Sequence, residues 1–356
     1  MSVPKTHITV AQLLAENKAC IYHKIREEEA IPLPLFPLDP DHQWKHARFP
    51  ENFVLEIPMG KVFGRHGVVI TPDNKIIKET GFEWTRPIEK HTVFEMEAMP
   101  ELTYVDLTVA VIAAQAPANY YHWMLEIIPR IKMLKDSKVP FDKLYVPYLR
   151  FNFQWESLGK LGFTEKDLIL GYQGLYIQAA RVVAPSLVNY KCATNPPWAI
   201  QFLRDVFLPG DSNGLPQNKR LYISRKDVTT DWARRYITNA GEVWSYLQSK
   251  GFDKVVLEDL PLDAQVKLFN AAEIVLGPHG AGLANLVFCR PGTKVFEFFH
   301  PELLDQAYWF LSDQLKLEHH CLTTSLDALT PTEKEKGDIF IPVKTLEDNL
   351  RLVEPN

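Results

Sequence analysis

The sequence predicts an α/β protein of two domains, the second of which has a parallel, Rossmann-like sheet. The chain has 356 residues, which is more than one hydrophobic core usually holds and corresponds to roughly two domains. Hydrophobic residues make up 46% of the chain, enough for a core in each half. From Arg220 to Phe298, short apolar runs alternate with amphipathic segments, as expected when parallel strands are joined by covering helices.

The N-terminal part of the chain is rich in proline and aromatic residues, most of all between Ile31 and Pro50. Because proline interrupts helices, this part is expected to form short strands and turns. Strand-forming runs occupy Phe53 to Ile57, Gly67 to Ile70 and Lys75 to Lys78. The turn sequence TPDN, Thr71 to Asn74, lies between the last two and predicts a hairpin.

The pattern changes at Tyr104, where YVDLTVAVIAA predicts a buried strand. A turn at Ala116 to Asn119 leads into a predicted helix from Tyr120 to Lys135, which contains Pro129. Three further elements are then predicted: a strand at Lys143–Pro147, a helix at Asn152–Leu161 and a strand at Leu175–Ala184.

Glycine, proline and asparagine accumulate from Leu208 to Asn218, which predicts the boundary between a domain of residues 1–208 and a domain of residues 209–356. The second domain alternates more regularly than the first. Its predicted elements are strand Arg220–Ser224, helix Asn239–Lys250, strand Lys254–Leu257, helix Asp263–Ala271, strand Glu273–Leu276, helix Gly280–Phe288, strand Lys294–Phe298 and a further strand at Asp338–Val343.

Composition and charge exclude several classes of protein. The net charge of −5 argues against nucleic-acid binding, which needs a basic face for the phosphates. The four cysteines are widely separated and lack CxxC spacing, so free thiols are expected and a zinc site is not. No apolar run approaches the roughly 18 residues that cross a bilayer, and the first residues lack a signal peptide's apolar segment. We therefore expect a cytoplasmic protein whose membrane contact, at the inner membrane, is at most peripheral.

The segment from Gly277 to Asn285, GPHGAGLAN, follows an apolar strand and opens a helix. Glycines at such a turn let backbone N–H groups approach a phosphate at the helix N-terminus, and ligands of parallel sheets bind at the carboxyl ends of strands. The spacing is neither GxGxxG nor GxxxxGK[ST], which disfavours dinucleotide oxidoreductases and P-loop enzymes. His279 is expected either to donate to a phosphate oxygen or to serve only as a turn residue.

A second candidate segment, Arg220 to Val243, carries arginines around the end of a predicted strand. Arg225 lies near the carboxyl end of that strand, and Arg235 follows one loop later. Guanidinium groups gathered there would neutralise a pyrophosphate without a metal, through bidentate hydrogen bonds. The alternative is a solvated charge run, to which Lys226 and Arg234 are assigned.

A third segment, ANYYHWMLEIIPRI, places His122 and Glu126 four residues apart on a predicted helix. At that spacing both side chains lie on one face, where an imidazole and a carboxylate form a general base with its orienting partner. The neighbouring Tyr120, Tyr121 and Trp123 suit stacking on a sugar, although aromatic residues at a helix start also serve as core. A buried histidine with a purely structural role is the other interpretation of His122.

Together these three segments resemble glycosyltransferase family 61, inverting transferases related to plant β-1,2-xylosyltransferase and to the O-GlcNAc and O-mannosyl-glycan N-acetylglucosaminyltransferases. The resemblance rests on NYYHWMLEIIPR, on LYISR followed by RYITN, and on AQVKLFNAAEIVLGPHGAGLANLVFCRPGTKVFE. It extends from about Ala110 to Glu297. Bacterial members are associated with capsular polysaccharide synthesis, which the resemblance implies for this chain too.

The resemblance implies a GT-B arrangement, in which two Rossmann-like domains face each other across a cleft and residues 209–356 bind the nucleotide-sugar. Residues 1–208 would bind the acceptor, with His122 or Glu126 facing it. One departure is that the family often has Asn-Glu after its arginine loop, where this chain has Asn239 and Ala240. The donor-binding residues implied by the resemblance are Arg225 and Arg235 at the phosphates, His279, Gly280, Ala281, Gly282 and Leu283 around the pyrophosphate, Glu297 at the ribose hydroxyls, and Asn239.

The expected reaction is an inverting, single-displacement transfer from a nucleotide-sugar, UDP-linked and of the xylose or N-acetylglucosamine type. The acceptor would be a hydroxyl of a glycan or a lipid-linked saccharide. A DxD-like string occurs at Asp39 to Asp41, in the proline-rich region, where it is expected to form a turn, so no obligatory cofactor or divalent ion is predicted. The alternative is a nucleotide-binding pseudoenzyme or binding module. The sequence leaves the oligomeric state open, a homo-oligomer included.

Overall fold

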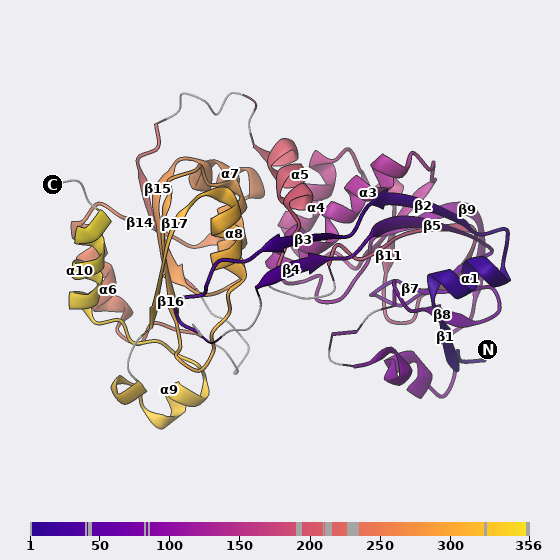
Figure 1. Ribbon diagram of the computed structural model, residues 1–356, viewed down its shortest axis with the longest axis horizontal. Helices are drawn as coiled ribbons and strands as arrows, with labels where there is room; N and C mark the ends of the chain where they lie inside the picture. Colours follow the sequence, from indigo (N-terminus) through magenta and orange to yellow (C-terminus); the bar gives the residue numbers. More distant parts are fainter. Residues whose placement is uncertain are drawn as a thin grey trace. The chain divides into compact units, whose positions relative to one another are not determined.

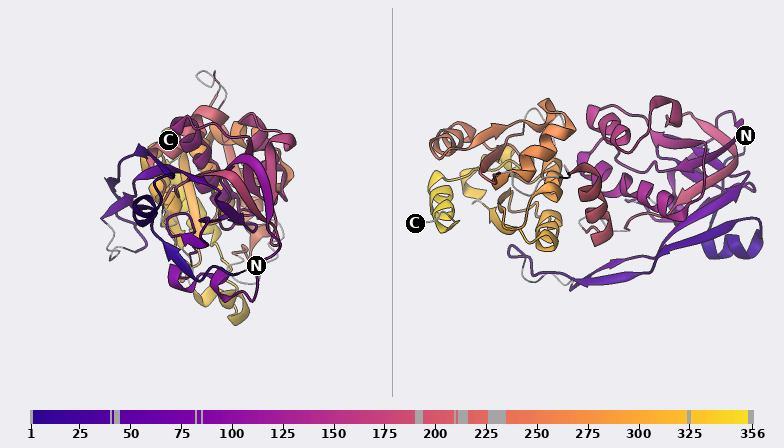
Figure 2. Two further views of the ribbon diagram at one scale, coloured as in Figure 1. Left: turned by 90° about the vertical axis from the view of Figure 1, so that its right-hand side faces the viewer. Right: turned by 90° about the horizontal axis from the view of Figure 1, so that it is seen from above.

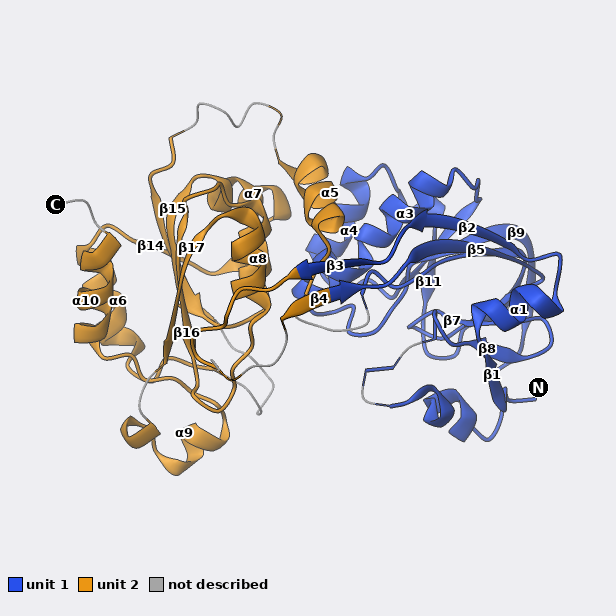
Figure 3. Cartoon of the chain, in the orientation of Figure 1, with its two compact units in different colours: residues 1–31, 48–190 blue, residues 32–47, 191–356 orange. Residues whose placement is uncertain are grey.

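The computed structural model describes residues 2–39, 41, 45–81, 83–84, 86–189, 194–208, 210, 216–225, 235–323 and 326–353. The chain divides into two compact units, coloured separately in Figure 3. Unit 1 comprises residues 1–31 and 48–190, and unit 2 comprises residues 32–47 and 191–356. Helix α5 (Pro197–Phe207) therefore belongs to unit 2, whereas the sequence boundary at residue 208 assigned it to the first domain.

Unit 1 is built on a ten-stranded mixed sheet in the order β1-β8-β7-β6-β12-β9-β10-β11, with β5 joining β12 to β2. Strands β12, β9, β10 and β11 run parallel, while β5, β6 and β7 pair antiparallel with their neighbours. The strands are β1 (Thr6–Ile8), β2 (Ile21–Arg26), β5 (Asn52–Pro58), β6 (Lys61–Phe63), β7 (Val68–Ile70), β8 (Lys75–Ile77), β9 (Thr103–Val111), β10 (Lys143–Pro147), β11 (Leu168–Gly171) and β12 (Tyr176–Pro185). The α/β class is confirmed, and the predicted hairpin is the β7–β8 pair, but only part of the unit 1 sheet has parallel Rossmann-like strands.

Short helices complete unit 1. Helix α1 (Val10–Glu16) begins in a capping box between Thr9 and Gln12, which satisfies backbone groups that a helix start leaves open. Helix α4 (Asn152–Lys160) lies between β10 and β11, where the sequence predicts it. Two single-turn 3₁₀ helices, Ile88–Lys90 and Thr92–Glu95, precede β9.

The helix after β9 is not regular. It starts as α2 (Tyr120–His122), widens into a π-helical turn over Trp123–Ile127 and continues as α3 (Pro129–Ser137). The Ile128 N–H donates to the Trp123 carbonyl over 2.9 Å, five residues back. Pro129 has no N–H with which to continue the α-helical pattern, and a widened turn accommodates this defect. The proline that the sequence places inside the helix thus coincides with a π-turn that includes Glu126.

Unit 2 contains a five-stranded parallel sheet in the order β14-β13-β15-β16-β17. Counted from β13, this is the order 2-1-3-4-5 of doubly wound folds, whose ligands bind where the strand order reverses, between β13 and β15. The strands are β13 (Lys219–Ile223), β14 (Asp253–Val255), β15 (Ala272–Pro278), β16 (Lys294–Phe299) and β17 (Glu318–Thr323). The helices are α6 (Ala240–Ser249), α7 (Leu262–Asn270), a 3₁₀ helix at Ala281–Phe288, α8 (Ala307–Leu315), α9 (Pro331–Glu335) and α10 (Val343–Val353).

Helices cover both faces of the unit 2 sheet, with α6 and α10 on one side and α7 and α8 on the other (Figures 1 and 2). The side chains of β16 point alternately to these two faces of the sheet, because successive side chains of a strand lie on opposite faces. Phe296 and Phe298 pack in the cluster with Leu247 of α6 and Leu350 of α10. The intervening Glu297 therefore points to the α8 side.

The segment Asp338–Val343 does not form the additional strand that the sequence predicts. Ile339 makes a single parallel bridge with Ile237, and the chain then enters α10. The bridge nevertheless joins the C-terminal part of the chain to the loop before α6. A separate two-stranded ribbon is formed by β3 (Glu29–Pro32) and β4 (His46–Phe49), at the points where the chain passes between the units.

The predictions from composition concerned membrane-spanning segments and the state of the cysteines. Within the described residues, no helix combines the length and apolar character needed to cross a bilayer. Cys20, Cys289 and Cys321 carry free thiols, and the first two are buried, while Cys192 lies outside the described residues.

The burial of Trp123 in the helix after β9 predicts how its loss would change the free energy of unfolding. Trp123 is fully buried, and its indole N–H donates to the Ser157 hydroxyl over 2.8 Å. Trp123→Ala should lower the free energy of unfolding by about 3–5 kcal/mol, because it leaves a large cavity. Trp155→Ala is the matched control, since that indole is 37% exposed and should cost under about 1 kcal/mol. Urea denaturation measures both, and equal losses would contradict the packing described.

Candidate active site

A pocket of about 490 Å³ lies in unit 2 where the carboxyl ends of β13 and β15 meet. This is the switch point of the sheet, since the chain leaves β13 toward α6 on one face and leaves β15 toward the 3₁₀ helix on the other. The volume suits a small organic ligand. The lining residues are Tyr222, Ser224, Arg225, Arg235, Tyr236, Ile237, Ala240, Lys254, Val256 and Pro278.

Arg225 lines this pocket directly after β13, and its guanidinium is held by the turn that follows β15. Nη1 donates to the His279 carbonyl over 3.1 Å. A Cβ on Gly280 would lie 3.2 Å from the same nitrogen, so the guanidinium packs against the bare backbone of this glycine. Burial lowers the pKa of Arg225, and the positive charge of Arg235 lowers it further.

Arg235 lines the same pocket, and its backbone is in the left-handed region at φ 52°. This conformation is costly for a residue with a Cβ and is typical of positions fixed by their surroundings. The next residue is anchored, because the Tyr236 N–H donates to the Asp338 carboxylate over 3.0 Å. Burial lowers the pKa of Arg235 as well. Two half-buried guanidinium groups lie at one pocket, and burial disfavours the charge of each, so a bound anion would stabilise them.

Asn239 is engaged with the chain's own backbone. Its side-chain amide donates to the Ile341 carbonyl over 2.8 Å, and its carbonyl oxygen accepts from the Ile341 N–H over 3.1 Å. These bonds hold the loop that carries Arg235 against the segment before α10. The predicted contact between Asn239 and a donor stays a prediction.

His279 lies at the end of β15 above a buried carboxylate. Its Nδ1 is 2.6 Å from Oε1 of Glu297, and its ring stacks on Phe299 with a centroid separation of 5.3 Å. Glu297 is fully buried, and its second oxygen, Oε2, is 3.1 Å from Nε2 of His319. Burial acts to raise the pKa of Glu297, but the two histidines outweigh it and the pKa is lowered. Glu297 thus orients the imidazole of His279, and its predicted contact with a ribose stays a prediction.

The remaining residues of the glycine turn are arranged by close packing. Gly277 approaches the end of β13 so closely that a Cβ would lie 3.1 Å from the Ile223 carbonyl oxygen. The helix that begins at Ala281 is a 3₁₀ helix, with the Leu283 N–H donating to the Gly280 carbonyl. Leu283 is buried, whereas Ala281 and Gly282 are partly exposed at the helix start. The start of this helix follows directly after His279.

The other predicted pair, His122 and Glu126, lies in unit 1. His122 Nδ1 is 2.8 Å from Glu126 Oε2, and the side chains are 15% and 14% exposed. The Trp84 ring lies on the imidazole with a centroid separation of 4.3 Å. Glu126 and Trp84 line a narrow pocket together with His66 and His91. An imidazole bonded through Nδ1 to a carboxylate leaves Nε2 as the nitrogen that can exchange a proton with a ligand.

Arg130 is part of the NYYHWMLEIIPR motif, but the sequence predicts no role for it. Its fully buried guanidinium donates to the Ala113 carbonyl over 2.8 Å and to the Pro185 carbonyl over 2.7 Å. It thereby joins the chain just beyond β9 to the end of β12 beneath the His122 helix. Burial lowers the pKa of Arg130 to about 9, so it stays charged at neutral pH. Its position in the motif was the signal from which a structural role could have been inferred.

Known proteins are similar to the part of the chain that contains these segments. Residues 120–296 match the family described as Glycosyltransferase 61, a range that begins at the His122 helix and ends within β16. Just under half of the chain thus matches glycosyltransferase family 61. The β-1,2-xylosyltransferase of Arabidopsis thaliana is 27% identical over 77 residues, 22% of this chain. That stretch covers 14% of the length of the plant protein. The resemblance to family 61 and to the plant β-1,2-xylosyltransferase is thus confirmed.

The arrangement of the two arginines at the unit 2 pocket predicts selective binding of a phosphate-type anion. Arg225→Gln should weaken inorganic pyrophosphate binding by roughly 10- to 150-fold, because a hydrogen bond to a charged group contributes about 1.5–3 kcal/mol. Arg220→Gln is the matched control, since Arg220 lies at the opposite, amino end of β13 and donates to the Lys250 carbonyl. Calorimetry measures both variants, and equal weakening would mean that net charge alone attracts the anion.

Proposed function

We propose that the chain transfers a sugar from a nucleotide-sugar to a hydroxyl group of a glycan or lipid-linked saccharide. The observation that carries the proposal is the pair of arginines, Arg225 and Arg235, at the switch point of a doubly wound sheet in a chain that resembles family 61. A pyrophosphate fits this site because it carries negative charge on several oxygens that guanidinium groups bind in pairs. The nucleotide would occupy the remainder of the unit 2 pocket.

The proposed donor is a UDP-sugar of the xylose or N-acetylglucosamine type. Its support is the local similarity to the plant β-1,2-xylosyltransferase. The nucleotide diphosphate leaves as the sugar is transferred, and negative charge grows on its terminal phosphate. Before the reaction, the His279 carbonyl holds the Arg225 guanidinium, and the Asp338 carboxylate anchors the backbone next to Arg235 through the Tyr236 N–H. Such preorganised charges stabilise the leaving group, and one contact of this kind contributes on the order of 3 kcal/mol to the barrier.

The proposed base is His122. In a single displacement with inversion, the acceptor hydroxyl loses its proton as its oxygen attacks the anomeric carbon. The Nε2 atom of His122 would receive that proton, while Glu126 at Nδ1 would stabilise the imidazolium that forms. Trp84, lying on the ring, holds the plane of the imidazole. This scheme requires the two units to present His122 and the diphosphate pocket to one cleft, the GT-B arrangement that we propose.

Mutation of the base should separate turnover from donor binding. His122→Ala is expected to lower kcat by roughly 100- to 10,000-fold and to change the donor affinity little, because general-base catalysis contributes about that factor. His7→Ala is the control, a partly exposed histidine of β1 in the same unit. Sugar transfer with a panel of UDP- and GDP-sugars measures kcat. Normal turnover by His122→Ala together with loss in Glu126→Gln would transfer the role of base to Glu126.

We propose that no divalent cation bridges the donor phosphates, since the two arginines supply the positive charge. Calorimetry of UDP binding tests this in buffer freed of Mg²⁺ and Mn²⁺ by a chelating resin, and again with Mg²⁺ added. The two affinities should agree within about twofold, because the diphosphate oxygens are neutralised by guanidinium groups. UDP binding that appears only with Mg²⁺ would contradict this part of the proposal.

A second candidate function is a binding module that holds the nucleotide without transferring a sugar. Donor hydrolysis distinguishes the two, because an active transferase generally cleaves its donor slowly with water as acceptor. A protein that binds UDP tightly but neither hydrolyses nor transfers any sugar of the panel would favour the binding module.

A further inference from the structure

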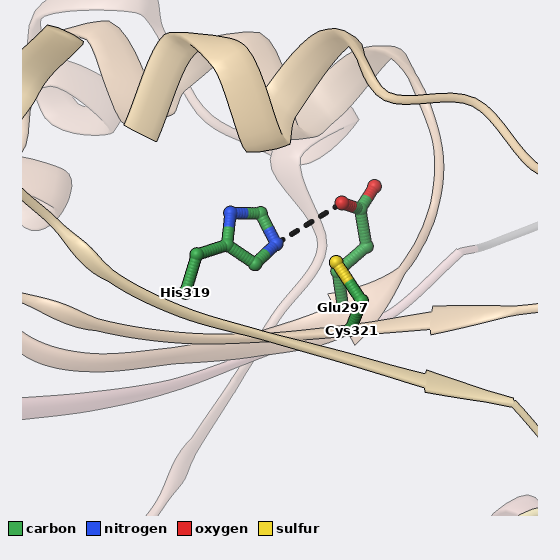
Figure 4. Close-up of side chains that lie close together, drawn as sticks. All are labelled: Glu297, His319 and Cys321. Carbon is green, nitrogen blue, oxygen red and sulfur yellow. Dashed lines mark ion pairs between the residues drawn. The ribbon is translucent and has the colours of Figure 1, made fainter. Parts of the chain in front are cut away.

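Three side chains of different chemistry converge on the α8 side of strands β16 and β17. The register pairs Glu297 with Cys321 and Val295 with His319. Because side chains alternate along a strand, Glu297, His319 and Cys321 lie on one face of the sheet. A carboxylate oxygen, an imidazole nitrogen and a thiol sulfur all lie within 4.8 Å of one another there. Figure 4 shows the three side chains in close-up.

Two of these donor atoms are buried without a good hydrogen bond. Oε2 of Glu297 and Nε2 of His319 are 3.1 Å apart, yet within the described residues neither atom has a hydrogen-bond partner of acceptable geometry. Buried polar atoms are nearly always hydrogen-bonded, since leaving one unsatisfied is costly. The two atoms face each other along the dashed line in Figure 4, and the Cys321 sulfur lies beside them. The two atoms thus form an ion pair without a hydrogen bond of acceptable geometry, and a cation between them would give each a direct partner.

The other ring nitrogen of His319 and the other carboxylate oxygen of Glu297 already have partners. Nδ1 of His319 is 2.7 Å from the Ser312 hydroxyl of α8, so the ring presents Nε2 to the cluster. Oε1 of Glu297 is 2.6 Å from Nδ1 of His279, so the carboxylate presents Oε2. Metal ligands characteristically have this outer support, in which a histidine or carboxylate is oriented through its other atom.

We propose that Glu297, His319 and Cys321 bind a zinc ion. Sulfur, nitrogen and oxygen donors of this kind suit tetrahedral Zn²⁺, with a fourth position left for water. At the usual zinc–ligand distances, a nitrogen and an oxygen ligand are about 3.3 Å apart, close to the separation of Nε2 and Oε2. A carboxylate and a thiolate together balance the charge of the ion, which favours binding at a buried site.

Such an ion would join β16 to β17 directly and would fix Glu297, whose other oxygen orients His279. It is separate from the donor phosphates, which we place at Arg225 and Arg235, and it does not depend on the proposed sugar transfer. The three ligands do not form a common zinc motif in the sequence, because His319 and Cys321 have H-x-C spacing and the third ligand, Glu297, lies on another strand.

Cobalt substitution tests the site in the intact chain, since Co²⁺ replaces zinc and its bonds to thiolate are coloured. Titration of the reduced protein with Co²⁺ should give one ion per chain, with a near-ultraviolet sulfur-to-cobalt charge-transfer band and the visible bands of tetrahedral Co²⁺. Added Zn²⁺ should abolish these bands. Zn²⁺ should also raise the Tm of the wild-type protein, because a ligand that binds only the folded state stabilises it.

Variants assign the ligands. Cys321→Ser should remove the charge-transfer band, and His319→Gln should weaken Co²⁺ binding at least tenfold. His320→Gln is the matched control, because His320 lies on the opposite face of β17 and stacks on Phe296 at 4.7 Å. Cys192→Ser controls for a thiol outside the described residues. Absence of the band in folded wild-type protein, its survival in Cys321→Ser, or its loss in either control would overturn the proposal. Since the readout is the spectrum of the metal, failure of sugar transfer would leave this result unaffected.

Discussion

The contact between Arg225 and the turn after β15 is the interaction on which the unit 2 site depends. The guanidinium rests against Gly280 and donates to the His279 carbonyl, so a residue at the end of β13 is fixed by residues at the end of β15. The strand ends can approach this closely because Gly277 has no side chain to hold them apart at Ile223. A parallel sheet opens a crevice at this point, and here the crevice is lined by positive charge.

A second constraint acts beneath this turn, where Glu297 is a buried charge. A carboxylate is stable there only because basic groups flank it, with His279 on one oxygen and His319 near the other. The backbone of His279 thus positions Arg225 while its imidazole is positioned by Glu297. The loop carrying Arg235 is held from another direction, through Asp338 and Ile341 near the C-terminal helix. Arg225 and Arg235 therefore meet at one pocket because residues far away in the sequence hold the backbone beside them or the guanidinium itself.

Much of the fold could be predicted from the sequence. Alternating apolar runs located β13 to β16 and the helices between them. The helix that begins at Tyr120 was also predicted, but the π-turn within it was not. Residues 338–343 are as apolar as a strand, but they form only a single bridge to the loop that carries Arg235. Such a pairing depends on contacts distant in sequence, so the local pattern could not predict it. Helix α5 was not predicted, because prolines precede it and the pattern before it indicates an interruption.

Some residues of the candidate site could be predicted from local sequence, and others could not because their roles depend on contacts distant in the chain. Local spacing located the pair His122 and Glu126, and the motif GPHGAG located the turn that holds Arg225. Tertiary contacts determine what Asn239, Glu297 and Arg130 do, since their partners are Ile341, His319 and Pro185, far away in the chain. The Glu297 cluster was not predicted at all, because its members are adjacent only across two paired strands.

The most direct test of the proposed donor site is a crystal structure of the protein with UDP bound. We expect the diphosphate to lie between the guanidinium groups of Arg225 and Arg235, beside the turn formed by His279 and Gly280, with the uridine in the unit 2 pocket. A nucleotide bound elsewhere in the chain, or a diphosphate that contacts neither arginine, would contradict the central claim.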